Sequence, residues 1–368
     1  MTGYLFVILW VGLCAFLSKY VFVKRKELVC GVEEERYTWL TAFIVFLPLI
    51  IVAGSRGYVF DTTAYIKWFT KTLPNSFGEA FSILGTDEKD KGFYIFSTLI
   101  KSIFGDDYHV YLMIIAAIQG LIILSIYRKY SINYVLSVFL FVASVDYIGW
   151  MFNGMRQFFA VTIVFAATPL ILKKKYFPLL CIILLAFTMH KSALIMIPII
   201  LICQGKAFNK RTIVFIVAIL LAVAFLGSFT NLLDNVLSDT DYARFSDKNQ
   251  FGEGTSPIKA IVFSIPFIIA VIGRKKIKEI DNPIIDFSAN MSIIASGLYI
   301  MAAVLPAGVL FGRLPIYASL YNYILLPWEI EKVFSDKAKP IMYILLIIGY
   351  LAYFYYQTNI RVSLLFTV

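Results

Sequence analysis

Charged residues are scarce in this 368-residue chain: they make up 15% of it, whereas hydrophobic residues make up 60%. Soluble domains carry about a quarter charged residues, so this composition excludes an ordinary water-soluble enzyme. Histidine and cysteine are rare as well, with two and four residues. Two histidines are too few for a multi-histidine metal site, and the cysteines show neither a disulfide framework nor a CxxC spacing. The sequence therefore predicts a protein that needs no bound metal and no cofactor.

Long hydrophobic runs fill most of the chain instead. A helix needs roughly 20 apolar residues to cross the hydrocarbon core of a membrane, so the chain has room for about a dozen spans with short connections. Residues 4–23 are followed by Lys24, Arg25 and Lys26 and by no small-residue cleavage site, and we expect them to be a retained first span. The runs cover about residues 4–23, 38–54, 109–126, 132–150, 158–172, 176–189, 192–204, 212–230, 257–273, 284–305, 316–330 and 340–357.

Basic residues cluster at every second connection, as expected when positively charged loops stay inside. Residues 93–104 are apolar but short and carry Lys101. Counting them as a span inverts every later basic loop, so we expect an interfacial or re-entrant helix on the outer side. The net charge of +10 is then a topological signal and not a nucleic-acid-binding surface. The basic clusters lie at residues 24–26, 128–129, 173–175, 206–211, 274–278 and 332–339.

These patterns predict an all-α polytopic membrane protein with about 12 transmembrane helices plus the short interfacial or re-entrant helix. In this prediction residues 1–368 form a single integral-membrane bundle without a soluble domain. Residues 55–108 form an outer loop that contains the interfacial helix. Residues 231–256 form a second outer loop.

Polar residues collect in the connections assigned to the outer side. Burying such groups is costly unless they are paired or hydrated, so they are candidates for function. Arg156, Lys191 and Arg313 each stand where a predicted span enters from outside. A helix N-terminus already carries partial positive charge, and a cation there favours a bound anion such as a lipid pyrophosphate. The candidate catalytic residues are Asp61, Arg156 and His190, and the candidate substrate-binding residues are Arg56, Tyr65, Asn153, Gln157, Lys191, Arg244, Arg313 and Tyr317.

Each candidate also has an ordinary structural interpretation. A single arginine at the end of a span, such as Arg313, is commonly an anchor at the membrane interface. Asp61 lies in a predicted loop, where a carboxylate is ordinarily just solvated. His190 fits equally well as a hydrated histidine at a helix end. The case for a site role is stronger at Arg156, because an Asn-Gly pair that breaks the helix stands directly before it.

Three groups of residues stand out together: Arg56, Asp61 and Tyr65; Asn153, Arg156-Gln157 and Ala160; and His190-Lys191-Ser192-Ala193. In order and topology they resemble the EpsG-like family of bacterial polysaccharide polymerases, which is related to the Wzy-type polymerases of O-antigen and capsule. The resemblance covers roughly residues 1–330. Two positions depart from the family pattern. Phe60 stands where a glycine commonly precedes the aspartate, and Asp90-Lys91 stands where a glutamate is expected ahead of Gly92.

The resemblance implies a GT-C-like bundle and a metal-independent glycosyltransferase that makes O-antigen, capsule or exopolysaccharide. Such an enzyme transfers a growing glycan from undecaprenyl pyrophosphate to a new lipid-linked repeat unit. The reaction takes place in the bacterial cytoplasmic (inner) membrane, with the active site facing the periplasm or cell exterior. The implied partners are the lipid-linked glycans, the bilayer, a chain-length regulator and a flippase, with no nucleic acid.

In this mechanism Arg156, Arg244 and Arg313 stabilise the charge that develops on the pyrophosphate. Asp61 and His190 both remain open as the general base, and we favour Asp61 as base with His190 in a positioning role. A flippase or transporter of lipid-linked oligosaccharide is an alternative, but it predicts internal repeats, and none is apparent. An O-antigen ligase or another lipid-linked glycosyltransferase also fits. An acyltransferase predicts a catalytic histidine or acid in an early inner-side span, where none is found.

Overall fold

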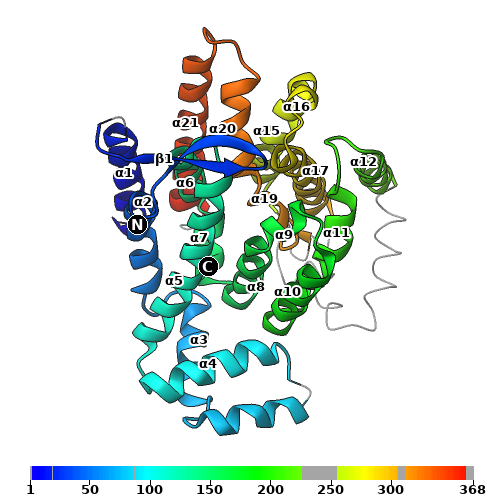
Figure 1. The fold of residues 1–368 in the computed structure, drawn as a ribbon. Helices are drawn as coiled ribbons and strands as arrows, with labels where there is room; N and C mark the ends of the chain where they lie inside the picture. Colours follow the sequence, from blue (N-terminus) through cyan, green and yellow to red (C-terminus); the bar gives the residue numbers. More distant parts are fainter. Residues whose placement is uncertain (1, 19, 87, 226–254, 306–310, 362–368) are drawn as a thin grey trace. The chain divides into compact units, whose positions relative to one another are not determined.

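The computed structural model describes residues 2–18, 20–86, 88–225, 255–305 and 311–361, and 76% of the protein is helical. Two compact units divide the chain (Figure 1). The first contains Met1–Met196 and Asp336–Val368, and the second contains Ile197–Ser335. The predicted single bundle over residues 1–368 stays a prediction.

The first unit is built from helices and one β-hairpin. Its helices before residue 131 are α1 (Thr2–Leu17), α2 (Trp39–Gly54), α3 (Thr62–Lys71), η1 (Phe77–Gly85), α4 (Lys91–Phe104) and α5 (Tyr108–Tyr130). Those that follow are α6 (Tyr134–Ala143), α7 (Asp146–Phe152), α8 (Met155–Ala166), α9 (Thr168–Leu172), α10 (Tyr176–Met189), η2 (Lys191–Ile195), α21 (Lys339–Tyr355) and η4 (Tyr356–Arg361).

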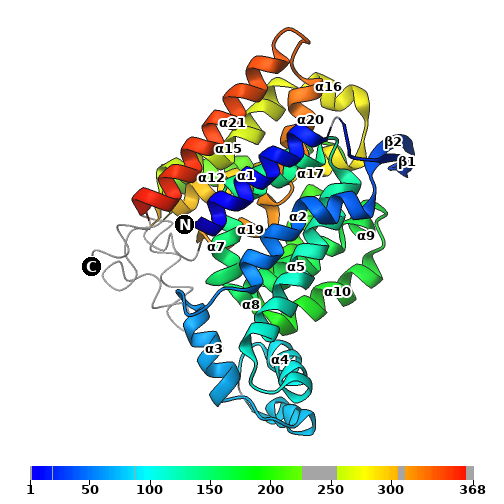
Figure 2. The same cartoon turned by 90° about the vertical axis from the view of Figure 1, so that its left-hand side faces the viewer.

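The connection after α1 is an antiparallel hairpin, which the sequence interpretation treated only as a basic loop. Strand β1 (Lys24–Val29) pairs with β2 (Val32–Tyr37) (Figure 2). Arg128 at the end of α5 fixes the hairpin, because its Nε donates to the Tyr37 carbonyl at 2.6 Å and its guanidinium pairs with Glu27. The hydrogen bond from Arg128 lowers the pKa of Glu27. The hairpin is therefore tied to a helix end and is not a free loop.

Capping residues explain where several helices begin. Asp107 accepts hydrogen bonds from the backbone N–H groups of residues 109 and 110 at the start of α5, and Asn133 accepts one from Leu136 at the start of α6. These short side chains satisfy N–H groups that have no partner within the helix. Val145 has a φ of 58°, and at this residue α6 and α7 are bent by 65°. The predicted span 132–150 is thus broken in the structure.

Helices α3, η1 and α4 lie together at one end of the first unit (Figure 1). Lys101 of α4 holds this segment together, because its buried Nζ donates to the carbonyls of Phe69, Thr70 and Leu73 at 2.8–2.9 Å and lies 3.0 Å from Asp106. The last turn of α3 and the residues after it therefore have their carbonyl groups satisfied by a side chain from α4. The interfacial placement of 93–104 stays a prediction.

In the part of the chain that the structure describes, three helices are long and apolar enough to cross a membrane: Tyr108–Tyr130, Pro283–Val304 and Lys339–Asn359. The number rises to five if each of two bent pairs forms one span. Five further apolar helices of 10–17 residues lie in the described part of the chain. The mostly helical, apolar character of the prediction is confirmed. The count of about 12 spans is not established by these helices.

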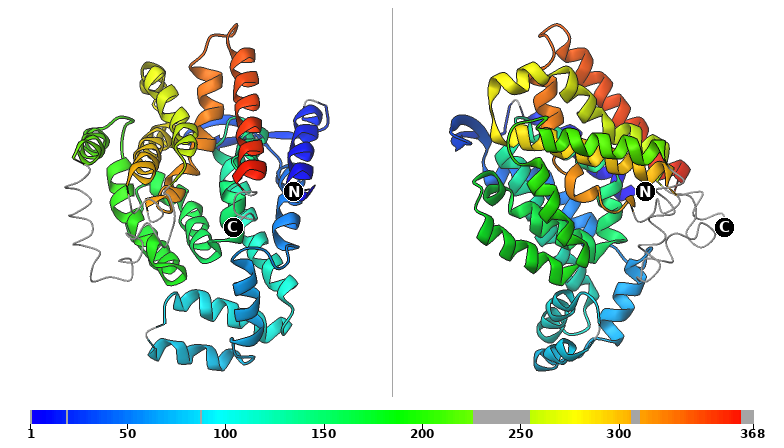
Figure 3. Two further views of the ribbon diagram at one scale, coloured as in Figure 1. Left: turned by 180° about the vertical axis from the view of Figure 1, so that it is seen from behind. Right: turned by 90° about the vertical axis from the view of Figure 1, so that its right-hand side faces the viewer.

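In the second unit, α17 packs against α12, α15 and α20, and most of its residues are buried. Asn282 begins α17 by accepting a hydrogen bond from Ile284 N–H at 3.1 Å. Helices α15 and α16 are bent by 69° at Gly273, and Figure 3 shows this part of the chain in yellow. The helices of the unit within the described residues are α11 (Met196–Cys203), α12 (Lys210–Ala224), α15 (Pro257–Ile272), α16 (Arg274–Ile280), α17 (Pro283–Val304), α19 (Ile316–Ser319) and α20 (Asn322–Lys332).

Candidate functional site

Arg56 holds the start of α3 in place through Thr62. Its side chain is 7% exposed, and its Nε donates to Thr62 Oγ1 at 3.1 Å. The same guanidinium donates to the Ala53 carbonyl and stacks over the Phe152 ring at 4.9 Å. Thr62 Oγ1 in turn donates to the Phe152 carbonyl at 2.9 Å. Arg56 thus joins α2, α3 and α7, and its role in substrate binding stays a prediction.

Asp61 stands at the beginning of α3 with an exposed carboxylate. Its backbone N–H donates to Asn153 Oδ1 at 3.3 Å, so the two predicted site residues are adjacent although 92 positions separate them. Within the described residues the Asp61 carboxylate has no hydrogen bond or ion pair, not even to the helix it precedes. The carboxylate is therefore free to accept a proton or a hydrogen bond from a ligand.

Gly92 lets α4 approach α10 closely. A Cβ at this position would lie 2.6 Å from Thr188 Cβ and 3.1 Å from its backbone carbon, and closer still to Thr188 Oγ1. Real Cβ atoms do not approach other atoms so closely. The absence of a side chain at Gly92 therefore sets the position of Asp90, which precedes α4 with a φ of 57°.

Asp90 and Arg156 form an ion pair at the centre of the site. Arg156 Nη1 lies 2.9 Å from Asp90 Oδ2, and Arg156 Nε donates to the Tyr65 hydroxyl at 3.4 Å. Asp90 is only 8% exposed and also accepts a hydrogen bond from the Lys191 backbone N–H. No acidic residue close to Arg156 in the sequence is its partner. The fold supplies Asp90 from 66 positions away.

Burial affects the charge state of Asp90. Removal from water raises the pKa of its carboxyl group, and the charge of Arg156 and the Lys191 N–H oppose that rise without cancelling it. Arg156, by contrast, is 41% exposed. Its Nε and Nη1 each have one partner, and no hydrogen bond of Nη2 occurs within the described residues. The guanidinium therefore still presents donors to a ligand.

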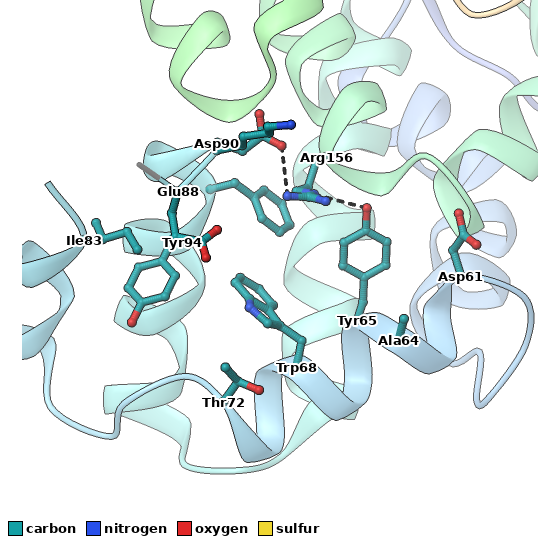
Figure 4. A pocket seen from close by; sticks show the side chains of 12 residues that line it. Asp61, Ala64, Tyr65, Trp68, Thr72, Ile83, Glu88, Asp90, Tyr94 and Arg156 are labelled. Carbon is teal, nitrogen blue, oxygen red and sulfur yellow. Dashed lines mark hydrogen bonds and ion pairs between the residues drawn. The ribbon is translucent and has the colours of Figure 1, made fainter. Parts of the chain in front are cut away.

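A cavity of about 430 Å³ opens beside this ion pair (Figure 4). Three carboxylates lie on it, and in the view of Figure 4 Asp61 is beyond Tyr65 at one end while Glu88 is beside Tyr94 at the other. Burial, with the charges of Glu79 and Glu88, raises the pKa of Tyr94. The lining residues are Asp61, Ala64, Tyr65, Trp68, Thr72, Ile83, Glu88, Lys89, Asp90, Phe93, Tyr94 and Arg156.

Aromatic rings form one wall of this cavity. Trp68 lies parallel to Phe93 with ring centroids 6.1 Å apart, and Tyr94 meets Trp68 edge-on at 6.0 Å. Tyr65 packs edge-on against Phe93 at 6.3 Å. Fixed rings of this kind present flat apolar faces beside hydrogen-bonding groups. The cavity thus combines a cation, carboxylates and aromatic faces.

His190 lies between α10 and η2 and begins the latter. Its Nδ1 accepts a hydrogen bond from Ser192 N–H at 3.3 Å and lies 2.7 Å from Ser192 Oγ. Because Nδ1 is the acceptor, the neutral ring carries its proton on Nε2. A neutral His190 is therefore a donor at its other nitrogen, which suits a positioning role better than that of a base. Lys191, directly after it, is exposed.

The remaining predicted residues are distributed over both units. Gln157 is buried next to Arg156 in the first unit, with 3% exposure. Arg313 is exposed and Tyr317 is buried, and both belong to the second unit. Arg244 lies outside the described residues. The structure therefore brings together Asp61, Tyr65 and Arg156 in one cavity, with Asn153 and Lys191 in contact with it through Asp61 and Asp90. Joining Arg244, Arg313 and Tyr317 to this cavity stays a prediction.

Sequence reasoning missed Glu88, Trp68 and Tyr94, and it noted Asp90 only as a departure from a family pattern. The usable signal was an aspartate two residues before a glycine, at the start of an apolar run in a predicted outer loop. No spacing in the sequence indicated the pairing with Arg156. Among the residues that the structure describes, no three His, Cys, Asp or Glu side chains are grouped so as to hold a metal ion.

Comparison with known proteins adds independent information. The model of the EpsG family matches residues 39–363, which include the whole cavity, all of the second unit and most of the first. Comparison with curated proteins gave no match, and neither did comparison with solved structures. The match covers far more than half of the chain and includes all three groups of residues that carried the resemblance. The chain belongs to the EpsG family.

Proposed function

We propose that this protein polymerises lipid-linked oligosaccharide repeat units by glycosyl transfer. Membership of the EpsG family and the apolar helices support a membrane protein with a polysaccharide polymerase-type role. The observation that carries the finer proposal is the cavity in which Arg156, open carboxylates and aromatic rings meet. The donor in this proposal is an undecaprenyl-pyrophosphate-linked glycan, and the acceptor is a hydroxyl of a new lipid-linked repeat unit.

The cation of the cavity supports a pyrophosphate leaving group. As the bond between the anomeric carbon and the pyrophosphate oxygen breaks, that oxygen takes the electron pair and becomes negatively charged. Arg156 presents unused donors of a planar fork, the geometry that matches two phosphate oxygens. Tyr65 and Asp90 hold the guanidinium in place beforehand, so little ordering remains when the ligand binds. Lys89 lines the cavity as a second cation, and the exposed Lys191 adds positive charge next to Asp90.

Asp61 is the proposed general base. The acceptor hydroxyl forms the new bond to the anomeric carbon and gives its proton to a carboxylate. Asp90 is unsuited to this role, because its carboxylate already pairs with Arg156 and accepts from Lys191. Asp61 has neither commitment within the described residues, and its helix start is fixed by Asn153 and Thr62. Glu88 is the rival carboxylate at the other end of the cavity.

The aromatic wall supports binding of a sugar. Trp68 and Tyr94 expose ring faces or edges to the cavity between the two open carboxylates (Figure 4). Sugar rings have apolar faces that stack on aromatic side chains, and their hydroxyl groups hydrogen-bond to carboxylates. A cavity of about 430 Å³ holds a short stretch of glycan, while the rest of the chain extends away.

The membrane topology of this proposal has about 12 spans and a GT-C-like arrangement, with the cavity facing the outside of the cytoplasmic membrane. It is tested with single cysteines at positions 61, 191 and 276 in a variant whose four native cysteines are replaced. All three sites are exposed. We expect an impermeant thiol reagent to label 61 and 191 in intact cells and 276 only after lysis. Labelling of 191 only after lysis would overturn the orientation.

The role of Asp61 is tested with purified protein and a lipid-linked repeat unit. We expect Asp61→Asn to bind the substrate with near-normal affinity and to lose at least about 100-fold in turnover, the usual contribution of a general base. Glu79→Gln is the matched control, since Glu79 is an exposed carboxylate close to the cavity that does not line it. Normal turnover by Asp61→Asn together with loss in Glu88→Gln would move the base to Glu88.

A further inference from the structure

The second unit contains a larger cavity that the proposed reaction does not use. It has a volume of about 760 Å³ and lies among the connection after α11, the start of α12, the bend between α15 and α16, and the start of α17. Lysine and arginine side chains line it together with apolar ones. The lining residues are Lys206, Ala207, Phe208, Ile213, Val271, Arg274, Lys275, Lys278, Asp281 and Asp286.

Buried polar side chains of α17 give this cavity a fixed shape. Asp286 accepts a hydrogen bond from Ala207 N–H at 2.9 Å, and Asn290 Oδ1 accepts one from Phe208 N–H at 2.9 Å. The amide of Asn290 also donates to the Cys203 carbonyl at 3.0 Å. Because these hydrogen bonds hold the connection after α11 at its backbone, the cavity wall is preformed.

Three cations on the cavity have no acidic partner among the described residues. Arg274, Lys275 and Lys278 line it from α16, and no ion pair of theirs occurs in the part of the chain that the structure describes. Lys206 differs from them, because it pairs with Asp281. Lys276 is on the same helix but does not line the cavity, and it lies 3.8 Å from Glu279. The unpaired charge is thus concentrated on the side of α16 that faces the cavity.

Another part of the lining is apolar and exposed. Ile213 of α12 is 50% exposed and Val271 of α15 is 41% exposed, and both continue into the exposed apolar side chains Val214 and Ile272. A cavity with unpaired cations at one side and accessible apolar surface at the other fits an amphiphilic anion. The alternative is that these cations serve only as the positive charges that keep a loop on the inner side of the membrane. That role requires them to lie in a connection, but it does not require them to line a preformed cavity.

We propose that this cavity binds the phosphodiester headgroup of an anionic membrane glycerophospholipid. Arg274, Lys275 and Lys278 contact the phosphate, and the acyl chains lie along the exposed apolar sides of α12 and α15. Basic pockets between membrane helices bind such headgroups because clustered cations attract the anionic leaflet. In the proposed topology this site is at the cytoplasmic surface. The inference goes beyond the glycosyl transfer and does not depend on it.

Lipid binding to the purified full-length protein tests this proposal. Phosphatidylglycerol is titrated into the detergent-solubilised protein, with phosphatidylcholine as the neutral comparison, and bound lipid is counted by native mass spectrometry. We expect tight binding of phosphatidylglycerol only. Each cation removed by Arg274→Gln, Lys275→Gln or Lys278→Gln is expected to weaken it about fivefold, the usual effect of one basic residue at an anionic surface. Lys276→Gln is the matched control and should leave binding unchanged.

A second variant is expected to strengthen lipid binding. Its result cannot be explained by misfolding, which would weaken binding. Asp281→Asn removes the partner of Lys206 and adds a free cation to the lining, so we expect tighter binding of phosphatidylglycerol. Equal weakening in Lys276→Gln would overturn the assignment to this cavity. Binding of inorganic phosphate or pyrophosphate as tight as that of the lipid would overturn the assignment to a membrane lipid. Polymerisation is measured in the same variants. Loss of lipid binding without loss of polymerisation, or the reverse, shows which of the two proposals fails.

Discussion

Gly92→Ala is a small substitution that the structure predicts to disable the cavity. The added methyl group collides with Thr188 of α10, including its backbone carbon at 3.1 Å, so a rotation of the Thr188 side chain cannot relieve the overlap. Helix α4 has to move away from α10. Asp90 precedes α4 by one residue and pairs with Arg156, so the movement draws Asp90 away from the guanidinium.

The size of the effect follows from the energy of overpacking. An extra methyl group in a well-packed contact costs about 1–3 kcal/mol. If this energy appears as loss of the Arg156–Asp90 arrangement, polymerisation falls about 5- to 150-fold, at about 1.4 kcal/mol for each factor of ten. Thr188→Gly removes the two nearest side-chain atoms at a helix-propensity cost of about 0.3–0.5 kcal/mol, because threonine is itself a poor helix former. The double variant Gly92→Ala with Thr188→Gly should therefore recover part of the lost activity.

The assay is the glycan chain-length distribution on a gel, from a deletion strain that carries each variant at matched protein level. Gly85→Ala is the control, because nothing lies within 4 Å of a Cβ at Gly85. The reasoning is refuted if Gly92→Ala makes wild-type chain lengths. It is also refuted if Thr188→Gly adds its own loss to that of Gly92→Ala without any recovery.

Lys101→Met should lower the free energy of unfolding by about 2–4 kcal/mol, because it removes three hydrogen bonds that a buried charge donates. Thermal unfolding in detergent measures this loss, with Lys67→Met at an exposed lysine as the control. Equal melting temperatures of the two variants would contradict the prediction. Arg156→Lys should restore only part of the chain length that Arg156→Ala loses, since a point charge does not reproduce a bidentate fork; full restoration on the gel would count against pyrophosphate binding there. Burial raises the pKa of Asp90, so protonation favours the folded state and this contribution is lost as the pH rises through the folded-state pKa. Acidification should also break the ion pair with Arg156, and the acid limb of the pH–activity profile should move in Asp90→Asn; an unmoved limb would assign it to another group.

Much of the helical pattern could be predicted from hydrophobic runs, because apolar segments of this length are typical of membrane helices. The bends could not. Val145 has a left-handed φ that its type does not favour, and nothing in the run 132–150 marks that residue as the break. The hairpin at Lys24–Tyr37 was missed because its charged strands look like an ordinary basic loop, and Arg128, which fixes it, is about 100 positions away.

Part of the site could also be predicted, because polar residues stand out next to apolar runs in the sequence. Asp61 and Arg156 carry polar groups next to apolar runs, and this contrast is visible in the sequence. Arg56 shows the same contrast, yet its guanidinium donates to Thr62, to the Ala53 carbonyl and to the Met155 sulfur. Whether a cation faces a ligand or the protein interior depends on packing between distant helices. The pairing of Asp90 with Arg156 depends on the same packing, and so it required the structure.

Chain extension by the purified protein tests the account most directly. The protein is placed in liposomes with lipid-linked repeat units and EDTA, and the products are separated by chain length. We expect the wild-type protein to lengthen the glycan and release undecaprenyl pyrophosphate, and Arg156→Ala to do neither although it remains folded and inserted in the membrane. Lipid-linked repeat units that are moved across the bilayer without being joined, or full extension by Arg156→Ala, would contradict a polymerase whose cavity is centred on Arg156.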